Sequence, residues 1–197
     1  MRHRLIGIAT VLGLVAASSS AQAAHHLWSF SSMFSNSTGS VQYVEMICGN
    51  DNNENALAPF TITTGTHTLN FVTNLPSTNT ANTWLLCATS GFQSIPGGIA
   101  PDYVIPASFF PTGGGTLNYA SGTSTWTYGA VPMNGVLMLK RNGTTATNAP
   151  HNFAGAVGSV NLSPAVPMLP AWGLAVMIGA LLLLASGLLR RREAPSA

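Results

Sequence analysis

This 197-residue sequence has few charged residues, and their scarcity narrows the range of functions. Asp, Glu, Lys and Arg make up 6% of the chain, against ~25% in ordinary soluble domains. The net charge of +2 comes from arginines near the two ends. Between positions 24 and 170 the charged residues are Glu45, Asp51, Glu54, Asp102, Lys140 and Arg141. A near-neutral central region excludes the basic surface that nucleic-acid binding requires.

The sequence also lacks the short motifs of common enzymes. It contains no Gly-x-Ser-x-Gly and no His-Glu-x-x-His, the patterns of a hydrolase serine and a zinc protease. The glycines at 113–115 are not followed by Lys-Ser or Lys-Thr, so they do not form a phosphate-binding loop. Asp102 could join His67 or His151 and a serine in a triad, but sequence order permits almost any such triple. We therefore predict no enzyme and no cofactor.

The first residues have the pattern of a secretion signal. Arg2 and Arg4 precede an uncharged apolar run at 5–17, and Ala-Gln-Ala at 21–23 has the small-x-small pattern that signal peptidase recognises. The apolar run is short for a membrane span, which needs ~20 residues. We predict that residues 1–23 are a signal helix, that signal peptidase cuts directly after them, and that the protein is exported across the inner membrane.

A second apolar run, at 171–189, is long enough to cross a membrane. It carries no charge, and as a helix it would reach ~28 Å, close to the ~30 Å hydrocarbon core. The tripeptide Arg190-Arg191-Arg192 follows it, and basic residues remain on the cytoplasmic side. We predict a transmembrane helix at 171–189 and a basic cytoplasmic tail at 190–197. An ectodomain at 24–162 then lies outside the inner membrane.

A sorting motif precedes this helix. Val-Pro-Met-Leu-Pro-Ala-Trp-Gly at 166–173, followed by the apolar run and the arginines, resembles the IPTL-type C-terminal sorting domain of Gram-negative bacteria, which reads roughly Ile-Pro-Thr-Leu-Ser-Glu-Trp-Gly. The matching positions, the first a near match, are Val166, Pro167, Leu169, Trp172 and Gly173. The resemblance implies that an exosortase-like transpeptidase removes the helix and releases or re-anchors the protein at the surface. Prolines within 163–170 predict an extended linker. A permanent single-span anchor is the alternative.

The region at 24–162 shows no helical periodicity of useful length, and its pattern is that of an all-β domain. Short β-prone runs recur between turn residues, at 41–48, 60–64, 67–72, 84–88, 103–105, 116–119, 124–128 and 135–140. Arg141-Asn142-Gly143 is a hairpin-type turn signal. About seven to nine short strands in one domain of this length favour a β-sandwich.

Four segments of this region resemble exported bacterial domains of the lamin-tail type. In those domains one strand carries a Tyr/Phe-x-Glu element, which is matched here by Tyr43-Val44-Glu45. The segments are FSNSTGSVQYVEM at 34–46, WLLCATSGF at 84–92, PDYVIPASFF at 101–110 and GVLMLKRNGTTATNAPHNFAG at 135–155. The resemblance implies an immunoglobulin-like sandwich with adhesive or structural roles and no known chemistry.

The two cysteines, Cys48 and Cys87, both lie in apolar strand-like runs. An even cysteine count in an exported protein favours a bridge. A bridge closing a loop of ~40 residues would contribute roughly 3–4 kcal/mol. The alternatives are two buried thiols or a metal pair. We expect a disulfide.

Two weak patterns concern metals. Asp51 and Glu54, in an Asn-rich stretch, carry the oxygen ligands that Ca²⁺ prefers but lack EF-hand spacing; the alternative is a solvated turn. Signal cleavage would leave Ala24-His25-His26 at a new N-terminus. A free amine with His third can hold Cu²⁺ or Ni²⁺ in a square-planar four-nitrogen set; the alternative is a polar stub. We predict no metal, with these residues as candidates.

These observations together predict a non-enzymatic, surface-destined structural, adhesive or matrix protein. Its expected partners are signal peptidase, an exosortase-like transpeptidase, the membrane, and surface polysaccharide or envelope proteins. The alternative is an envelope-anchored binding module for a small ligand or metal ion. A preformed pocket with converging polar groups would favour that alternative.

Overall fold

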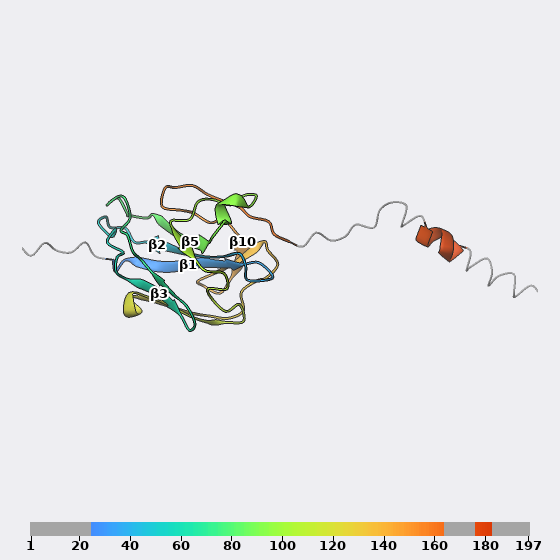
Figure 1. Ribbon diagram of the computed structural model, residues 1–197, viewed down its shortest axis with the longest axis horizontal. Helices are drawn as coiled ribbons and strands as arrows, with labels where there is room; N and C mark the ends of the chain where they lie inside the picture. The colour runs from blue at the N-terminus through green and yellow to red at the C-terminus, as the bar shows by residue number, and fades with distance from the viewer. Residues whose placement is uncertain (1–24, 164–175, 183–197) are drawn as a thin grey trace, which may run out of the picture. The chain divides into compact units, whose positions relative to one another are not determined.

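The computed structural model describes residues 25–163 and 176–182 (Figure 1). The chain divides into two compact units, Met1–Leu162 and Ser163–Ala197, each described by itself. In the described part of the first unit, ten strands form two sheets. The expected all-β class is confirmed, and the strand number exceeds the seven to nine that the sequence predicts.

The larger sheet has six strands, in the order β10-β9-β1-β2-β5-β6. All neighbours are antiparallel except β5 and β6, which run parallel. Figure 1 shows β1 and β2 at the centre of this sheet. The strands are β1 (Trp28–Ser35), β2 (Gln42–Cys48), β5 (Trp84–Thr89), β6 (Tyr103–Ile105), β9 (Leu137–Lys140) and β10 (Thr145–Thr147).

The smaller sheet has four antiparallel strands, in the order β4-β3-β7-β8. They are β3 (Thr61–Thr64), β4 (Thr68–Asn70), β7 (Gly115–Tyr119) and β8 (Ser124–Tyr128). Two short 3₁₀ turns accompany the sheets, η1 (Phe92–Ser94) and η2 (Ala120–Gly122). A turn that begins at Thr64-Gly65 joins β3 to β4.

The main hydrophobic core lies between the two sheets. Alternate residues of each strand point inward, because successive side chains of a strand face opposite sides. The six-stranded sheet contributes Phe30, Val44 and Leu85, and the four-stranded sheet contributes Ile62, Leu117 and Trp126, all of them buried. This arrangement is a β-sandwich.

A bulge in β1 changes which side chains face this core. The pairing with β2 runs Phe30↔Met46 and then Ser32↔Glu45, so Ser31 is the extra residue. Phe30 and Met33 consequently both face the four-stranded sheet. In a regular strand, residues three positions apart would face opposite sides. The alternation of apolar and polar residues breaks at this point, which is why the sequence does not predict a strand here.

The outer face of the six-stranded sheet carries a second hydrophobic core over half of its area. This core is formed by Phe34, Tyr43, Leu86, Ala88, Phe92, Met138 and Val160, all buried. The Asn148 amide holds the covering chain in place: its Nδ2 donates to the Val160 carbonyl at 2.7 Å, and its Oδ1 accepts from the Val160 N–H at 2.9 Å. The other half of the outer face lacks this cover.

The β9–β10 hairpin is tied to both sheets through Arg141, and the expected turn at 141–143 is confirmed. The Arg141 main-chain N–H donates to the Ser31 carbonyl at 2.8 Å, at the β1 bulge. Its guanidinium reaches the smaller sheet, donating to Ser124 Oγ and to the Thr125 carbonyl, each at 3.2 Å. One side chain therefore links the hairpin to the neighbouring sheet.

The expected disulfide is not formed: Cys48 and Cys87 are free, buried thiols. Both face the main core, on the neighbouring strands β2 and β5. Cys87 lies opposite Val44, whereas Cys48 follows Ile47, which lies opposite Trp84. Four residues of register, ~13 Å along a strand, therefore separate the thiols, and a bridge needs Cα atoms within ~7 Å.

The described part of the second unit is a helix at 176–182, inside the expected span at 171–189. Among the residues described, no helix is long and apolar enough to cross a membrane. The rest of the expected span lies outside the described residues, as do the signal at 1–23, the sorting motif at 166–173 and the tail at 190–197.

Candidate functional site

The half of the outer face that lies outside the second hydrophobic core carries polar side chains of the six-stranded sheet. Ser32 on β1 lies opposite Glu45 on β2, and Trp84 on β5 points to the same face. His151, from the segment that follows β10, lies above them. These four residues are separated by up to 119 positions in the sequence and form the candidate site.

Glu45 is the centre of this site. Only 2% of its surface is exposed. Its Oε2 accepts from Ser32 Oγ at 2.6 Å, and its Oε1 accepts from the His151 main-chain N–H at 2.8 Å. The His151 ring adds a contact of 2.9 Å between Nδ1 and Oε1. Burial raises the pKa of the Glu45 carboxyl, and the bonds from Ser32 and His151 act in the opposite direction.

Trp84 supports the imidazole ring of His151 from one side. The two rings are stacked, with centroids 4.6 Å apart and an angle of 19° between their planes. The His151 side chain is 28% exposed. Because Nδ1 is held by Glu45, Nε2 is the ring nitrogen left for solvent or a ligand.

The order of these groups does not match that of a hydrolase triad. In a triad the histidine lies between the carboxylate and the serine, so that it can take the proton of the hydroxyl. Here the carboxylate of Glu45 lies between, and Ser32 donates to it. Ser32 therefore gains no general base from His151, and the cluster is suited to holding and orienting His151.

A cleft of about 390 Å³ opens beside this cluster. Its walls combine apolar surface with hydrogen-bonding groups. The apolar side is made by Trp84, Met138 and Ala146, and the polar side by Lys140, Thr147 and His151. Such a mixture suits a ligand that offers both C–H surface and hydroxyl groups.

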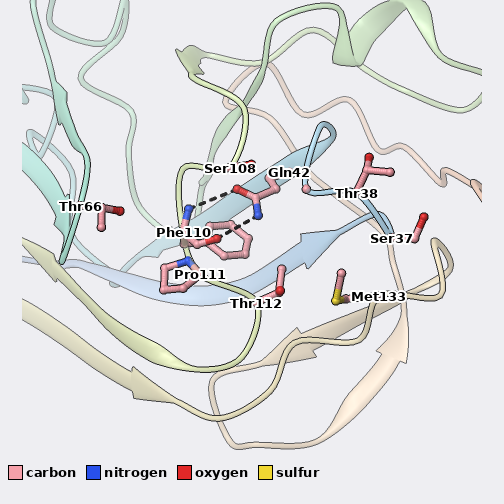
Figure 2. A pocket seen from close by; sticks show the side chains of 10 residues that line it. Ser37, Thr38, Gln42, Thr66, Ser108, Phe110, Pro111, Thr112 and Met133 are labelled. Atoms are coloured by element: carbon pink, nitrogen blue, oxygen red, sulfur yellow. Dashed lines mark hydrogen bonds between the residues drawn. The ribbon is translucent and has the colours of Figure 1, made fainter.

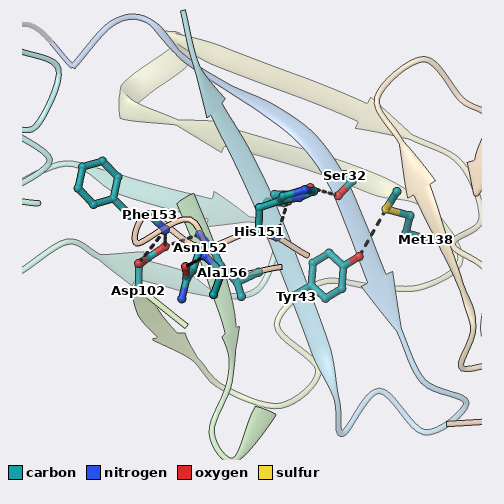
Figure 3. Close-up of polar contacts among 10 residues, drawn as sticks. Ser32, Tyr43, Asp102, Met138, His151, Asn152, Phe153 and Ala156 are labelled. Carbon is teal, nitrogen blue, oxygen red and sulfur yellow. Dashed lines mark hydrogen bonds and ion pairs between the residues drawn. The ribbon is translucent and has the colours of Figure 1, made fainter. Parts of the chain in front are cut away.

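The loop that carries His151 is pinned by a second carboxylate, as Figure 3 shows. Asp102 Oδ2 accepts from the Leu86 N–H at 2.8 Å and from the Phe153 N–H at 2.9 Å. Burial raises the pKa of the Asp102 carboxyl, and these two bonds oppose the rise. Asp102 thus serves the fold, and neither His67 nor His151 is among its hydrogen-bond partners in the described structure.

A second pocket, of about 260 Å³, lies near the β1–β2 turn (Figure 2). The Gln42 amide at its base is bonded to Phe110 in both directions: Nε2 donates to the Phe110 carbonyl at 3.0 Å, and Oε1 accepts from the Phe110 N–H at 3.2 Å. Hydroxyl groups of Ser37, Thr38 and Ser108 lie at the rim. The buried polar group of this pocket is therefore already paired within the protein.

The metal candidates are only partly brought together. His26 Nδ1 lies 3.7 Å from Glu54 Oε1. Asp51 is engaged through its carbonyl, which accepts from Thr80 Oγ1 at 3.2 Å. The His25 ring stacks on Phe60, with centroids 3.3 Å apart. Within residues 25–163 and 176–182, no three His, Cys, Asp or Glu side chains are placed to hold a metal ion.

Sequence reasoning missed the pairing of Glu45 with His151, which are 106 residues apart. A local signal existed, since a charged residue in the middle of an apolar strand is buried only when it has a partner. Glu45 is flanked by Val44 and Met46. The sequence offered no means of choosing His151 among five histidines.

Comparison with protein-family models, with curated proteins and with solved structures gives no match to this chain.

Proposed function

We propose that this chain is an exported, surface-destined protein with a structural or adhesive role and without enzymatic activity. In this proposal signal peptidase removes residues 1–23, and the protein is transiently anchored by the apolar helix. An exosortase-like transpeptidase then acts at the motif at 166–173. The sequence patterns at the two ends support this route. The division of the chain between Leu162 and Ser163 suits a handle that is processed apart from the sandwich.

The cleft beside Trp84 and His151 is the observation that carries the adhesive role. It combines an aromatic ring, a methionine, hydroxyls and one amine in a near-neutral body. Neutral polysaccharides present C–H faces that pack on aromatic rings and hydroxyls that bond to polar groups. A cell-surface polysaccharide is therefore the partner that the cleft fits best.

The absence of catalysis in this proposal follows from how the carboxylates are used. Glu45 accepts from Ser32 and His151, and Asp102 accepts from two main-chain N–H groups. These bonds fix loops and strands. A catalytic acid or base needs a proton that it can exchange with a substrate, and the oxygens of these carboxylates are engaged in hydrogen bonds within the protein.

We also infer that the sandwich is immunoglobulin-like and related to lamin-tail domains. Support comes from the Tyr43-Val44-Glu45 element, which lies in β2 at the centre of the larger sheet. Tyr43 packs in the outer core and Glu45 holds the His151 loop. An element with both tasks would be retained in such a family for structural reasons.

Retention on immobilised cell-surface polysaccharide tests the adhesive role. We expect the exported protein to be retained, and Trp84→Ala to weaken retention about tenfold, a change of ~1.4 kcal/mol. Thr116→Ala, at an exposed position of the smaller sheet, is the matched control and should bind as the wild type does. Equal retention of all three proteins would reject the cleft as the binding surface.

Mass spectrometry of secreted protein tests the processing route. We expect the mature chain to begin at Ala24 and to end near residues 164–173. Replacing Pro167 or Trp172 should trap the uncut form in the inner membrane. Full-length protein that accumulates there in the native host would favour a permanent anchor.

The cleft also supports a second candidate, a binding module for a small ligand. Its volume of about 390 Å³ lies within the range of ~300–1,000 Å³ found for small-molecule sites. The two candidates differ in one measurement. The measurement is affinity as a function of ligand length. A free small molecule would by itself saturate a small-ligand site, whereas the affinity of a polysaccharide site would rise with the length of the sugar chain.

A further inference from the structure

The cleft beside Trp84 and His151 is bordered by a lysine, and the charge of this lysine bears on which polysaccharide the cleft takes. Lys140 on β9 lies opposite Ser32 on β1, and Ser32 lies opposite Glu45 on β2. Side chains of directly opposite residues point to the same face of a sheet. The three side chains therefore form a polar row across the outer face, and all three line the cleft.

Glu45 does not neutralise Lys140. Its Oε2 accepts from Ser32 Oγ at 2.6 Å, and its Oε1 accepts from the His151 main-chain N–H at 2.8 Å. The carboxylate thus has donors of its own, and it is buried. Lys140 is exposed, and no ion pair within the described part of the chain includes it. The ammonium group is therefore available to a negatively charged partner.

The remaining acids of the sandwich leave this positive charge uncompensated. None of Asp51, Glu54 and Asp102 is among the residues that line the cleft. Glu54 is buried, and Asp102 accepts from the N–H groups of Leu86 and Phe153. The exposed lysine thus sets the charge that the cleft presents, and this charge is complementary to a ligand that carries negative charge.

We propose that the cleft selects an acidic polysaccharide, whose sugar residues carry a carboxylate, over a neutral one, and that Lys140 determines this preference. A uronic acid keeps the C–H faces and hydroxyls of a neutral sugar and has a carboxylate in place of the hydroxymethyl group. It therefore keeps the contacts that a neutral chain makes with the cleft and adds an ion pair. This inference deepens the adhesive role proposed above and rests on it.

The lining of the cleft is divided in the way that such a sugar is divided. Trp84 and Met138 offer apolar surface to its C–H face. The ring of His151 is held through Nδ1, which lies 2.9 Å from Glu45 Oε1, so Nε2 is left for a hydroxyl group. Lys140 offers the donors that a carboxylate accepts. Each kind of group on a uronic acid thus has a counterpart in the cleft.

An ammonium group is suited to this preference for two reasons. A hydrogen bond between ionised partners is about twice as strong as one between neutral groups. Lysine also carries a compact charge on a flexible stem, so it can reach a carboxylate without a fixed geometry. Replacing the carboxylate by a hydroxymethyl group removes the ion pair and leaves the packing on Trp84 in place. The preference should therefore depend on Lys140, and binding as such on Trp84.

Arg141 provides a matched control for charge. It follows Lys140 directly, but its guanidinium donates to Ser124 Oγ and to the Thr125 carbonyl of the smaller sheet, each at 3.2 Å. It does not line the cleft. Lys140→Gln and Arg141→Gln change the net charge of the protein equally, and only the first removes a charge from the cleft. Thermal melting checks that both variants are folded.

The test compares the affinity of the exported protein for a polyuronic acid with its affinity for the same polymer after reduction of the carboxyls to hydroxymethyl groups. We expect the wild type to bind the acidic polymer about tenfold more tightly, a difference of ~1.4 kcal/mol. Lys140→Gln should bind the two polymers equally, and Arg141→Gln should keep the preference. Trp84→Ala should weaken binding of both polymers. Added salt should reduce the preference, because it screens exposed charges.

The outcomes separate this inference from the adhesive role. Equal affinity of the wild type for the two polymers would overturn the preference and leave the adhesive role standing. Binding of neither polymer would overturn both. Equal loss of preference in Lys140→Gln and Arg141→Gln would show a general attraction to the charge of the protein, which would overturn the assignment to the cleft.

Discussion

The two halves of the outer face of the larger sheet differ in how far they are shielded from water. On the outer face of the larger sheet, the pair Phe34↔Tyr43 lies two positions along the strands from the pair Ser32↔Glu45. The first pair is buried in the outer core under the chain around Val160. The second pair lies beside an open cleft. A step of two residues therefore separates a part of the face that is buried in the outer core from a part that borders the cleft.

Removing the large side chain at the centre of the covered half should have the largest effect. Tyr43 is fully buried and stacks with Phe34 at a centroid distance of 5.4 Å. Tyr43→Ala should lower the free energy of unfolding by about 3–5 kcal/mol. Trp84→Ala, in the open half, should cost about half as much, because that ring is partly in water. Denaturant unfolding measures both, and equal losses would contradict the comparison.

Removing the Asp102 carboxylate, which holds the loop that carries His151, should have the next largest effect. Asp102→Ala removes the acceptor of the Leu86 and Phe153 N–H groups. Unpaired buried donors cost about 1–3 kcal/mol, so we expect a loss of about 2 kcal/mol. The Phe153 amide should exchange its hydrogen faster than in the wild type. In Asp102→Asn, which keeps one oxygen, the increase in exchange rate should be smaller. Unchanged exchange at Phe153 would show that the loop is held by other contacts.

The pH dependence of stability sharpens the comparison further. The pKa values of Glu45 and Asp102 are raised by burial. Between the unfolded values of about 4 and the folded ones, the folded chain holds more protons, so the free energy of unfolding falls as the pH rises. Glu45→Gln with Asp102→Asn should remove this fall. Subtracting the variant's free energy of unfolding from that of the wild type at each pH isolates the contribution of the two carboxyls. A difference that rises with pH would contradict the prediction.

The smallest effect should come from a reducing agent. Because Cys48 and Cys87 are free and buried, reduction should leave the melting temperature unchanged. A disulfide closing a loop of this length would instead contribute roughly 3–4 kcal/mol. A thiol reagent should find two thiols in the unfolded chain and react slowly with the folded one. Detection of fewer than two thiols after unfolding would reverse this assignment.

The fold was largely accessible from the sequence, and its exceptions have local causes. Periodicity predicted eight of the ten strands. It missed β1 because the bulge at Ser31 interrupts the alternation. It missed β10 because Thr145–Thr147 contains no large apolar side chain. Both misses arise where pairing with a neighbouring strand, rather than the local pattern, defines the strand.

The site was less accessible, because it depends on register. The disulfide was expected from a cysteine count, which says nothing of the four positions by which Cys48 and Cys87 are offset. Glu45 and His151 meet only once the last loop folds over the sheet. Spacing in the sequence constrains neither distance, so such contacts emerge only from the folded chain.

The β9–β10 hairpin has a consequence for resistance to proteolysis. Lys140 and Arg141 are the only lysine or arginine residues between positions 24 and 162, so trypsin-like proteases have just two adjacent cleavage sites in that whole region. Cleavage requires local unfolding, and here the main chain is bonded to Ser31 while the guanidinium is bonded to the smaller sheet. A protease of this specificity would have to open the hairpin first. The scarcity of lysine and arginine in the sandwich thus also makes it a poor substrate for trypsin-like proteases.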